Sequence, residues 1–77
     1  MKKNNSSRRK FVIIAKVKDY GAFIFVKYRT NHIDKTLNFI NQKFNQSMMY
    51  ANIYSNRGLN IREQVGSWGS KKGLQMN

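Results

Sequence analysis

Apolar and polar side chains alternate along much of the chain, first with the period of a β-strand. Residues 11–18 begin as an apolar, β-branched run and then alternate with lysine, and residues 22–29 are rich in Phe, Ile, Val and Tyr. Both segments are typical of strands. Because Asp19, Tyr20 and Gly21 supply turn residues between them, we expect the two strands to pair as a hairpin.

The period then changes to that of a helix, with apolar residues three or four positions apart at Ile33, Leu37, Ile40 and Phe44. This stripe predicts one amphipathic helix over about residues 32–45. Asn31 is a good N-cap residue, and Asp34 stands three positions later, where a capping box has Glu or Gln.

Strand-like alternation returns after the helix. Residues 47–55 place Met49, Ala51 and Ile53 on one face, and residues 59–65 predict a fourth, weaker strand. Residues 66–73 then contain three glycines among Ser, Lys and Trp, a composition that favours an extended, flexible tail.

The order strand, strand, helix, strand, strand predicts an α+β domain, with one helix packed on one face of a small antiparallel sheet. We expect a basic flexible arm at 1–10, a single domain at 11–65 and a Gly/Lys-rich flexible tail at 66–77. An OB-type small barrel is the alternative architecture. A single helix covers one sheet face, so the other face is where a ligand is expected to bind.

Charge adds a partner class to this picture. The 77 residues carry 15 Lys and Arg against 3 Asp and Glu, a net charge of +12. Such a surplus opposes the compact state until a polyanion neutralises it, and phosphate contacts release counterions from nucleic acid. The composition therefore predicts a nucleic-acid partner.

The same composition argues against other classes of protein. With no Cys, one His and three carboxylates, the chain lacks the residues for most enzymes and metal centres, so we expect no catalysis, metal or cofactor. No apolar run approaches the ~20 residues that span a bilayer, and none follows the basic start as a secretory signal would require. We expect an intracellular protein, in the cytoplasm or in an organelle matrix if organelle-encoded, without a membrane partner.

Two phenylalanines are the strongest candidate contacts. Because Lys27 and Arg29 should not point into a core, Phe23 and Phe25, which share their face of the strand, are expected on the open face. Lys16 and Lys18 of the first strand would join them. Aromatic rings among cations suit unpaired bases and their phosphates. The inverse register, with both phenylalanines beneath the helix, remains the alternative because a one-residue slip exchanges the faces.

Further candidates lie outside the first hairpin. The arm offers phosphate contacts at Arg8, Arg9 and Lys10, the fourth strand offers Arg62, and the tail offers Trp68, Lys71 and Lys72. Two alternatives stay open for Trp68, because the indole could stack on a base or fold back to cap the small core.

The segment Ala15–Ile24, with its Asp-Tyr-Gly-Ala-Phe sequence, resembles the first hairpin of S1-type RNA-binding domains. In that family this segment joins two strands of an OB barrel. The resemblance implies that Tyr20 and Phe23 stack on RNA. It covers this hairpin only, and it agrees with the charge on the class of partner.

We therefore expect a non-enzymatic nucleic-acid-binding protein, with RNA favoured over DNA, such as a small structural component of a ribonucleoprotein like the ribosome. One alternative is a DNA-binding accessory protein of a phage or mobile element. Another is a basic inhibitor that docks on the acidic surface of a nucleic-acid enzyme. A preference for duplex would indicate the first alternative, and a saturable protein complex the second.

Overall fold

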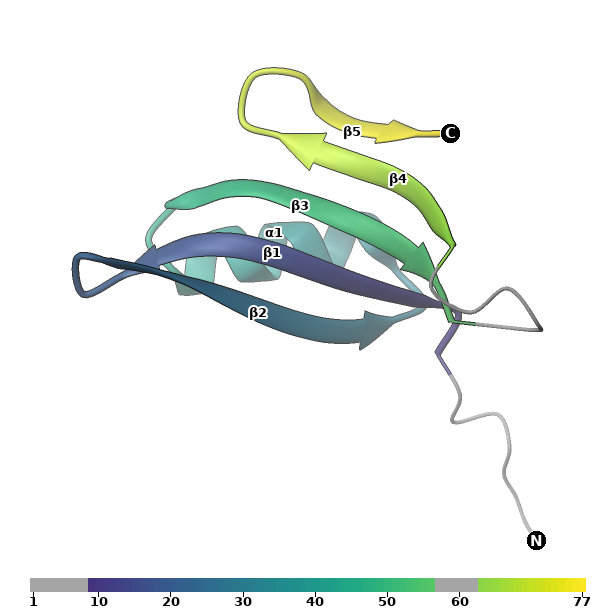
Figure 1. Ribbon diagram of the computed structural model, residues 1–77, viewed down its shortest axis with the longest axis horizontal. Coiled ribbons are helices and arrows are strands. Elements are labelled where there is room, and N and C mark those ends of the chain that lie inside the picture. Colours follow the sequence, from purple (N-terminus) through teal and green to yellow (C-terminus); the bar gives the residue numbers. More distant parts are fainter. Residues whose placement is uncertain (1–8, 57–62) are drawn as a thin grey trace, which may run out of the picture.

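The computed structural model describes residues 9–56 and 63–77. Its elements in chain order are β1 (Phe11–Asp19), β2 (Ala22–Thr30), α1 (Ile33–Lys43), β3 (Met48–Ser55), β4 (Gln64–Gly69) and β5 (Gly73–Met76). The strands form one antiparallel sheet in the order β2-β1-β3-β4-β5, with α1 behind it in Figure 1. The expected α+β class is confirmed, whereas the barrel alternative is wrong because the sheet is open.

The first hairpin forms as the sequence predicts. β1 and β2 pair over their full lengths, from Phe11 with Thr30 to Asp19 with Ala22. The two turn residues, Tyr20 and Gly21, have φ angles of 51° and 80°. Positive φ at both central positions is the geometry whose twist matches that of paired strands.

The C-terminal part of the chain differs from the prediction. We expected a flexible tail from residue 66, but residues 64–69 and 73–76 are the paired strands β4 and β5. Glycines leave gaps in the side-chain alternation, so the pattern that identifies a strand is lost there although the backbone still pairs. Residues 57–62, and with them most of the strand expected over 59–65, lie outside the described residues.

The core lies between α1 and the sheet. Its buried members are Ile13, Ala15 and Val17 from β1, Leu37 and Ile40 from α1, and Met48, Ala51 and Ile53 from β3. Because β1 lies between β2 and β3, both of its edges are paired and its inward residues are fully covered. This burial fixes which face of β1, and hence of the whole sheet, is turned away from α1.

Met48 and Met49, at the start of β3, lie on the opposite sheet faces from those that simple alternation predicts. The pairing of β1 with β3 shifts register between Lys16 and Val17, which is the mark of a β-bulge. As a result Met48 is buried with Ala51 and Ile53, whereas Met49, which we placed on the same face as those two residues, is 48% exposed. The alternation of the later residues of β3 is unaffected.

The start of the helix also needs correction. The N-cap residue is His32 rather than Asn31, and its side chain makes no capping hydrogen bond. Instead Thr30 organises the turn, because its Oγ1 accepts a hydrogen bond from the His32 N–H at 2.8 Å and one from the Thr36 hydroxyl at 2.7 Å. Asn31 Oδ1 accepts from the N–H of Lys10 at 2.8 Å and so ties the start of β1 to the end of β2.

The helix ends early for a backbone reason. The prediction extended it to residue 45, but Asn45 and Gln46 have φ angles of 56° and 60°, which no α-helix residue adopts. Along the described residues no helix is long and apolar enough to cross a membrane.

Candidate nucleic-acid interface

The register of β1 and β2 places both phenylalanines of β2 on the face away from α1. Phe23 lies opposite Lys18, and Phe25 lies opposite Lys16. Residues directly opposite one another in an antiparallel pair share a face, and the alternating residues of β1 are the core residues beneath the sheet. This is the register that we favoured, and the inverse register is wrong.

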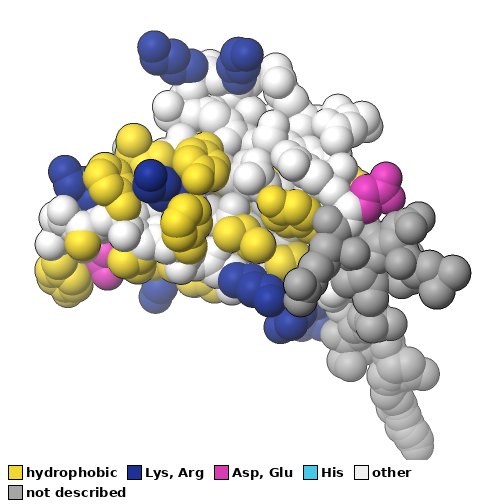
Figure 2. Space-filling view, viewed as in Figure 1, with side chains coloured by type: hydrophobic (Ala, Val, Ile, Leu, Met, Phe, Trp, Pro, Cys, Tyr) yellow, Lys and Arg dark blue, Asp and Glu magenta, His cyan; other side chains and the backbone are white. Residues whose placement is uncertain are grey.

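Lys27 and Arg29 continue the same face along β2, where they lie opposite Ile14 and Val12. We call the six side chains Lys16, Lys18, Phe23, Phe25, Lys27 and Arg29 the aromatic–basic patch. It belongs to the face seen in Figure 2, where hydrophobic side chains gather around a cationic one over the sheet. The first hairpin therefore brings together six of the predicted site residues.

The rings of the patch are open to solvent. Phe23 is 54% exposed and Phe25 is 63% exposed. Two ammonium groups lie over the Phe23 ring, with Lys16 Nζ 4.9 Å and Lys18 Nζ 5.9 Å from its centroid. Cation–π attraction holds both lysines above the sheet, so positive charge and aromatic surface are presented side by side.

β3 adds an aromatic side chain that our list of site residues omitted. Tyr50 pairs with Lys16, so it lies on the open face beside the patch, and it is 40% exposed. The alternation of residues 47–55, which puts Met49, Ala51 and Ile53 on one face, puts Tyr50 and Tyr54 together on the other. The sequence does not say which strand β3 pairs with, and only that pairing assigns Tyr50 to the patch side.

Trp68 lies on the other side of the sheet. It pairs with Ala51 of β3 and with Leu74 of β5, and it packs against the core. The structure thus favours the second of the two alternatives for Trp68, in which the indole covers the edge of the core. It does not share a surface with Phe23 and Phe25.

The other predicted contacts are scattered. Arg9 and Lys10 are held at the start of β1, because their carbonyl oxygens accept hydrogen bonds from Asn56 Nδ2 at 3.0 Å and from the Asn56 N–H at 2.9 Å. Lys71 and Lys72 are exposed in the turn between β4 and β5, at the sheet edge opposite β2. Arg8 and Arg62 lie outside the described residues.

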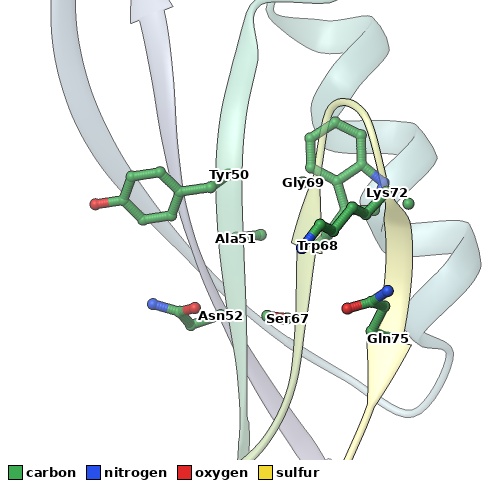
Figure 3. A pocket seen from close by; sticks show the side chains of 9 residues that line it. Tyr50, Ala51, Asn52, Ser67, Trp68, Gly69, Lys72 and Gln75 are labelled. Carbon is green, nitrogen blue, oxygen red and sulfur yellow. The ribbon is translucent and has the colours of Figure 1, made fainter.

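A second feature of the open face is a hollow over β3, β4 and β5, with a volume of about 520 Å³. We call it the polar trough. On this face it is lined by the backbone of Gly69 and Gly73, by the side chains of Tyr50, Asn52, Ser67 and Gln75, and at one end by Lys72. Figure 3 shows it from close by. Sequence reasoning missed this feature because it assigned residues 66–77 to a tail.

The residues that the structure describes contain no cluster of three or more His, Asp or Glu side chains that could hold a metal ion. Comparisons with protein-family models, with curated proteins and with solved structures gave no match. The geometry of the open face is therefore the feature of this chain that indicates a function.

Proposed function

We propose that the protein binds single-stranded nucleic acid, RNA in preference to DNA, on the aromatic–basic patch. The observation that carries this proposal is the exposure of Phe23 and Phe25, at 54% and 63%, among four cations on a sheet face that the helix leaves open. Exposed apolar rings that are adjacent to one another generally mark a binding surface. Stacking of a base on such a ring is worth about 1–3 kcal/mol.

The spacing of the rings favours an unpaired strand. Residues two apart on a β-strand are separated by about 7 Å. Successive bases of a duplex rise by only about 3.4 Å. Two neighbouring bases can therefore stack on Phe23 and Phe25, one base on each ring, only when the bases are unstacked from one another, as in a single strand. RNA is favoured because sheets that carry exposed aromatics are a common way of binding unpaired RNA.

The cations complete the site. Lys27 and Arg29 continue from the rings along β2, while Lys16 and Lys18 flank them on β1. A backbone that follows the strand direction would keep its phosphates within reach of these side chains. The same surface suits a small structural component of a ribonucleoprotein, in which folded RNA supplies both unpaired bases and a high density of phosphate.

The test is a double substitution with a matched control. Phe23→Ala with Phe25→Ala should weaken binding of a labelled single-stranded RNA by tenfold or more, since each stacked base contributes about 1–3 kcal/mol. Melting should be nearly unchanged, because both rings are more than half exposed. Phe39→Ala is the control, because Phe39 is also 53% exposed but lies on α1, beyond the sheet.

Wild-type affinity in the folded double variant would contradict the proposal. So would equal and steeply salt-dependent binding to single-stranded RNA, single-stranded DNA and duplex DNA, because charge alone would then explain the binding. In that case the search would turn to a duplex site or to an acidic protein target.

A further inference from the structure

β2 lies at one margin of the sheet, and in the part of the chain that the structure describes it pairs with β1 alone (Figure 1). It is nine residues long and pairs without a register shift. Natural edge strands are normally protected from other chains by shortness, a bulge, a proline or an inward-pointing charge. β2 has none of these, whereas β5 at the opposite margin has only four residues.

The free edge of β2 presents the backbone of the residues that form the aromatic–basic patch. Asp19 and Ala22 flank the two-residue turn, so they form a hydrogen-bonded pair, and such pairs alternate along the ladder. Lys18, the next residue of β1, accordingly donates its N–H to Ser47 O at 3.3 Å, on the side of β3. The N–H and C=O groups that point to the free edge are therefore those of Phe23, Phe25, Lys27 and Arg29.

The side chains on this edge are self-complementary about Val26. Phe23 and Phe25 precede Val26 on the open face, and Lys27 and Arg29 follow it at the same spacings. A second copy of β2, paired antiparallel on a two-fold axis at Val26, would therefore place a cation opposite every ring. Phe23 would lie opposite Arg29, and Phe25 opposite Lys27. Rings and cations that share a face in this way attract one another.

The neighbouring registers fit less well. Outward-pointing residues must lie opposite one another, so the register can change only in steps of two residues. One step places Lys27 opposite its own copy, where like charges repel. The opposite step leaves Arg29 opposite Gly21 of the turn and shortens the ladder. The register centred on Val26 pairs all nine residues of β2.

We infer that the protein forms a two-fold symmetric dimer in which the β2 strands of two copies pair antiparallel about Val26 and join the two sheets into one. An axis perpendicular to the sheet keeps both open faces on one side, so the two patches become neighbours. On the helix side Ile24, which is 37% exposed, would be covered by Tyr28 of the second copy. Each copy uses the same edge, so the contact closes at two chains.

Charge opposes this dimer and gives it a distinctive salt dependence. Each copy carries +12, so two copies repel one another at low ionic strength. At about 0.5 M salt this repulsion is screened beyond about 4 Å, while the backbone hydrogen bonds across the edge remain. Dimerisation should therefore strengthen as salt rises, whereas binding of nucleic acid weakens.

Single cysteines test the register, because the chain has no cysteine of its own. Val26 would face its own copy in a non-hydrogen-bonded pair with Cα atoms about 4.5 Å apart, which suits a disulfide. Val26→Cys should therefore cross-link in oxidised glutathione roughly tenfold or more faster than Ile24→Cys. Ile24→Cys is the matched control, because Ile24 is more exposed but would lie about 13 Å along the strand from its copy.

Sedimentation of the full chain without nucleic acid, at about 0.1 M and 0.5 M salt, measures the dimer itself. Lys27→Pro removes an outward N–H while the bonds to β1 remain, a substitution that edge strands tolerate. Because symmetry removes that hydrogen bond twice, dimerisation should weaken roughly tenfold to hundredfold. Lys27→Ala is its control, since it removes the same charge, keeps the N–H and should weaken the dimer far less.

A dimer that strengthens with salt, cross-links preferentially through Val26→Cys and is weakened by Lys27→Pro supports the inference. A chain that stays monomeric up to about 1 mM at both salt concentrations overturns it. Equal cross-linking of the two cysteine variants, or assembly beyond two chains, also overturns it. Circular dichroism checks the fold of each variant, and if Lys27→Pro unfolds, the cysteine pair decides. None of these measurements contains nucleic acid, so their outcome is separate from that of the proposed function.

Discussion

The two hairpins at the ends of the sheet are built on different principles. β1 and β2 are each nine residues long, joined by a two-residue turn, and carry apolar residues on one face and rings and cations on the other. β4 and β5 have six and four residues, contain three glycines and join through Ser70, Lys71 and Lys72. The first hairpin is specified by its side chains. The second is distinguished by its glycines, which leave open space where side chains would otherwise stand.

Under the proposed function, this difference gives the two halves of the open face different roles. The aromatic–basic patch offers surface for any base and any phosphate, and it has little means of choosing between sequences. The polar trough instead offers polar side chains around a floor that carries no side chain at Gly69. The two ends of the open face therefore present different chemistry to a bound strand.

The largest effect should follow truncation at the centre of the sheet. Ile13→Ala removes a fully buried side chain of β1 and should lower the free energy of unfolding by about 2–5 kcal/mol. Leu74→Ala, in the second hairpin, removes a partly buried side chain and should cost roughly 1–2 kcal/mol. Urea unfolding of both variants measures the contrast, and equal losses would show that the second hairpin is as firmly packed as the first.

A smaller effect should distinguish two glycines of β4. An added Cβ at Gly66 would lie 2.6 Å from Met76 Sδ and 3.0 Å from the backbone oxygen of Gln75, so Gly66→Ala should push β5 away and cost about 1–3 kcal/mol. Gly69→Ala is the matched control, because nothing lies within 4 Å of its Cβ. Thermal unfolding compares the two variants. Similar melting temperatures would show that β4 can pack against β5 without a glycine at position 66.

A substitution in the turn of the first hairpin should raise the stability of the protein, whereas the substitutions above lower it. Tyr20 holds a left-handed backbone conformation at φ 51° while its side chain is fully exposed. Asn tolerates this conformation better, so Tyr20→Asn should raise the free energy of unfolding by about 1 kcal/mol. A simultaneous loss of RNA affinity would assign the Tyr20 ring a role in binding, as the resemblance to S1-type hairpins implies. A lower free energy of unfolding in Tyr20→Asn would show that the left-handed backbone at Tyr20 is not strained.

The last comparison concerns charge. Lys16→Ala with Lys18→Ala should reduce the salt dependence of single-strand binding by about 1.4 in the logarithmic slope, the value for two phosphate contacts. Lys71→Ala with Lys72→Ala should do the same only if the strand reaches the β4–β5 turn. Titrations at several salt concentrations measure both slopes. An unchanged slope for the first pair would show that Lys16 and Lys18 do not contact phosphates.

Sequence reasoning predicted the elements whose side chains repeat with a clear period. The apolar residues of β1 and the cations at Lys27 and Arg29 favoured the observed face for Phe23 and Phe25, but only the pairing of β1 with β2 excludes the inverse register. The apolar stripe predicted α1. Other features depend on information that no local pattern holds. The bulge at Met49 arises from the pairing of β3 with β1. The same pairing places Tyr50 opposite Lys16, although the two residues are far apart in the chain.

The glycine-rich segment was missed for a related reason. Its strands are defined by backbone pairing with β3 and by the packing of Trp68 and Leu74, and a residue without a side chain contributes nothing to a hydropathy pattern. The trough could not be predicted once that segment was assigned to a tail. The large apolar side chains Trp68 and Leu74, which stand among the glycines, are the signal that could have indicated strands there.

The strand order has a consequence for how the chain assembles. After the β1–β2 hairpin, each later strand joins the same edge in the order of synthesis, β3 on β1, β4 on β3 and β5 on β4. Among the strands that the structure describes, none has to insert between two that are already paired. The sheet can therefore grow in one direction as the strands are synthesised, and β5 is the strand that completes the floor of the trough.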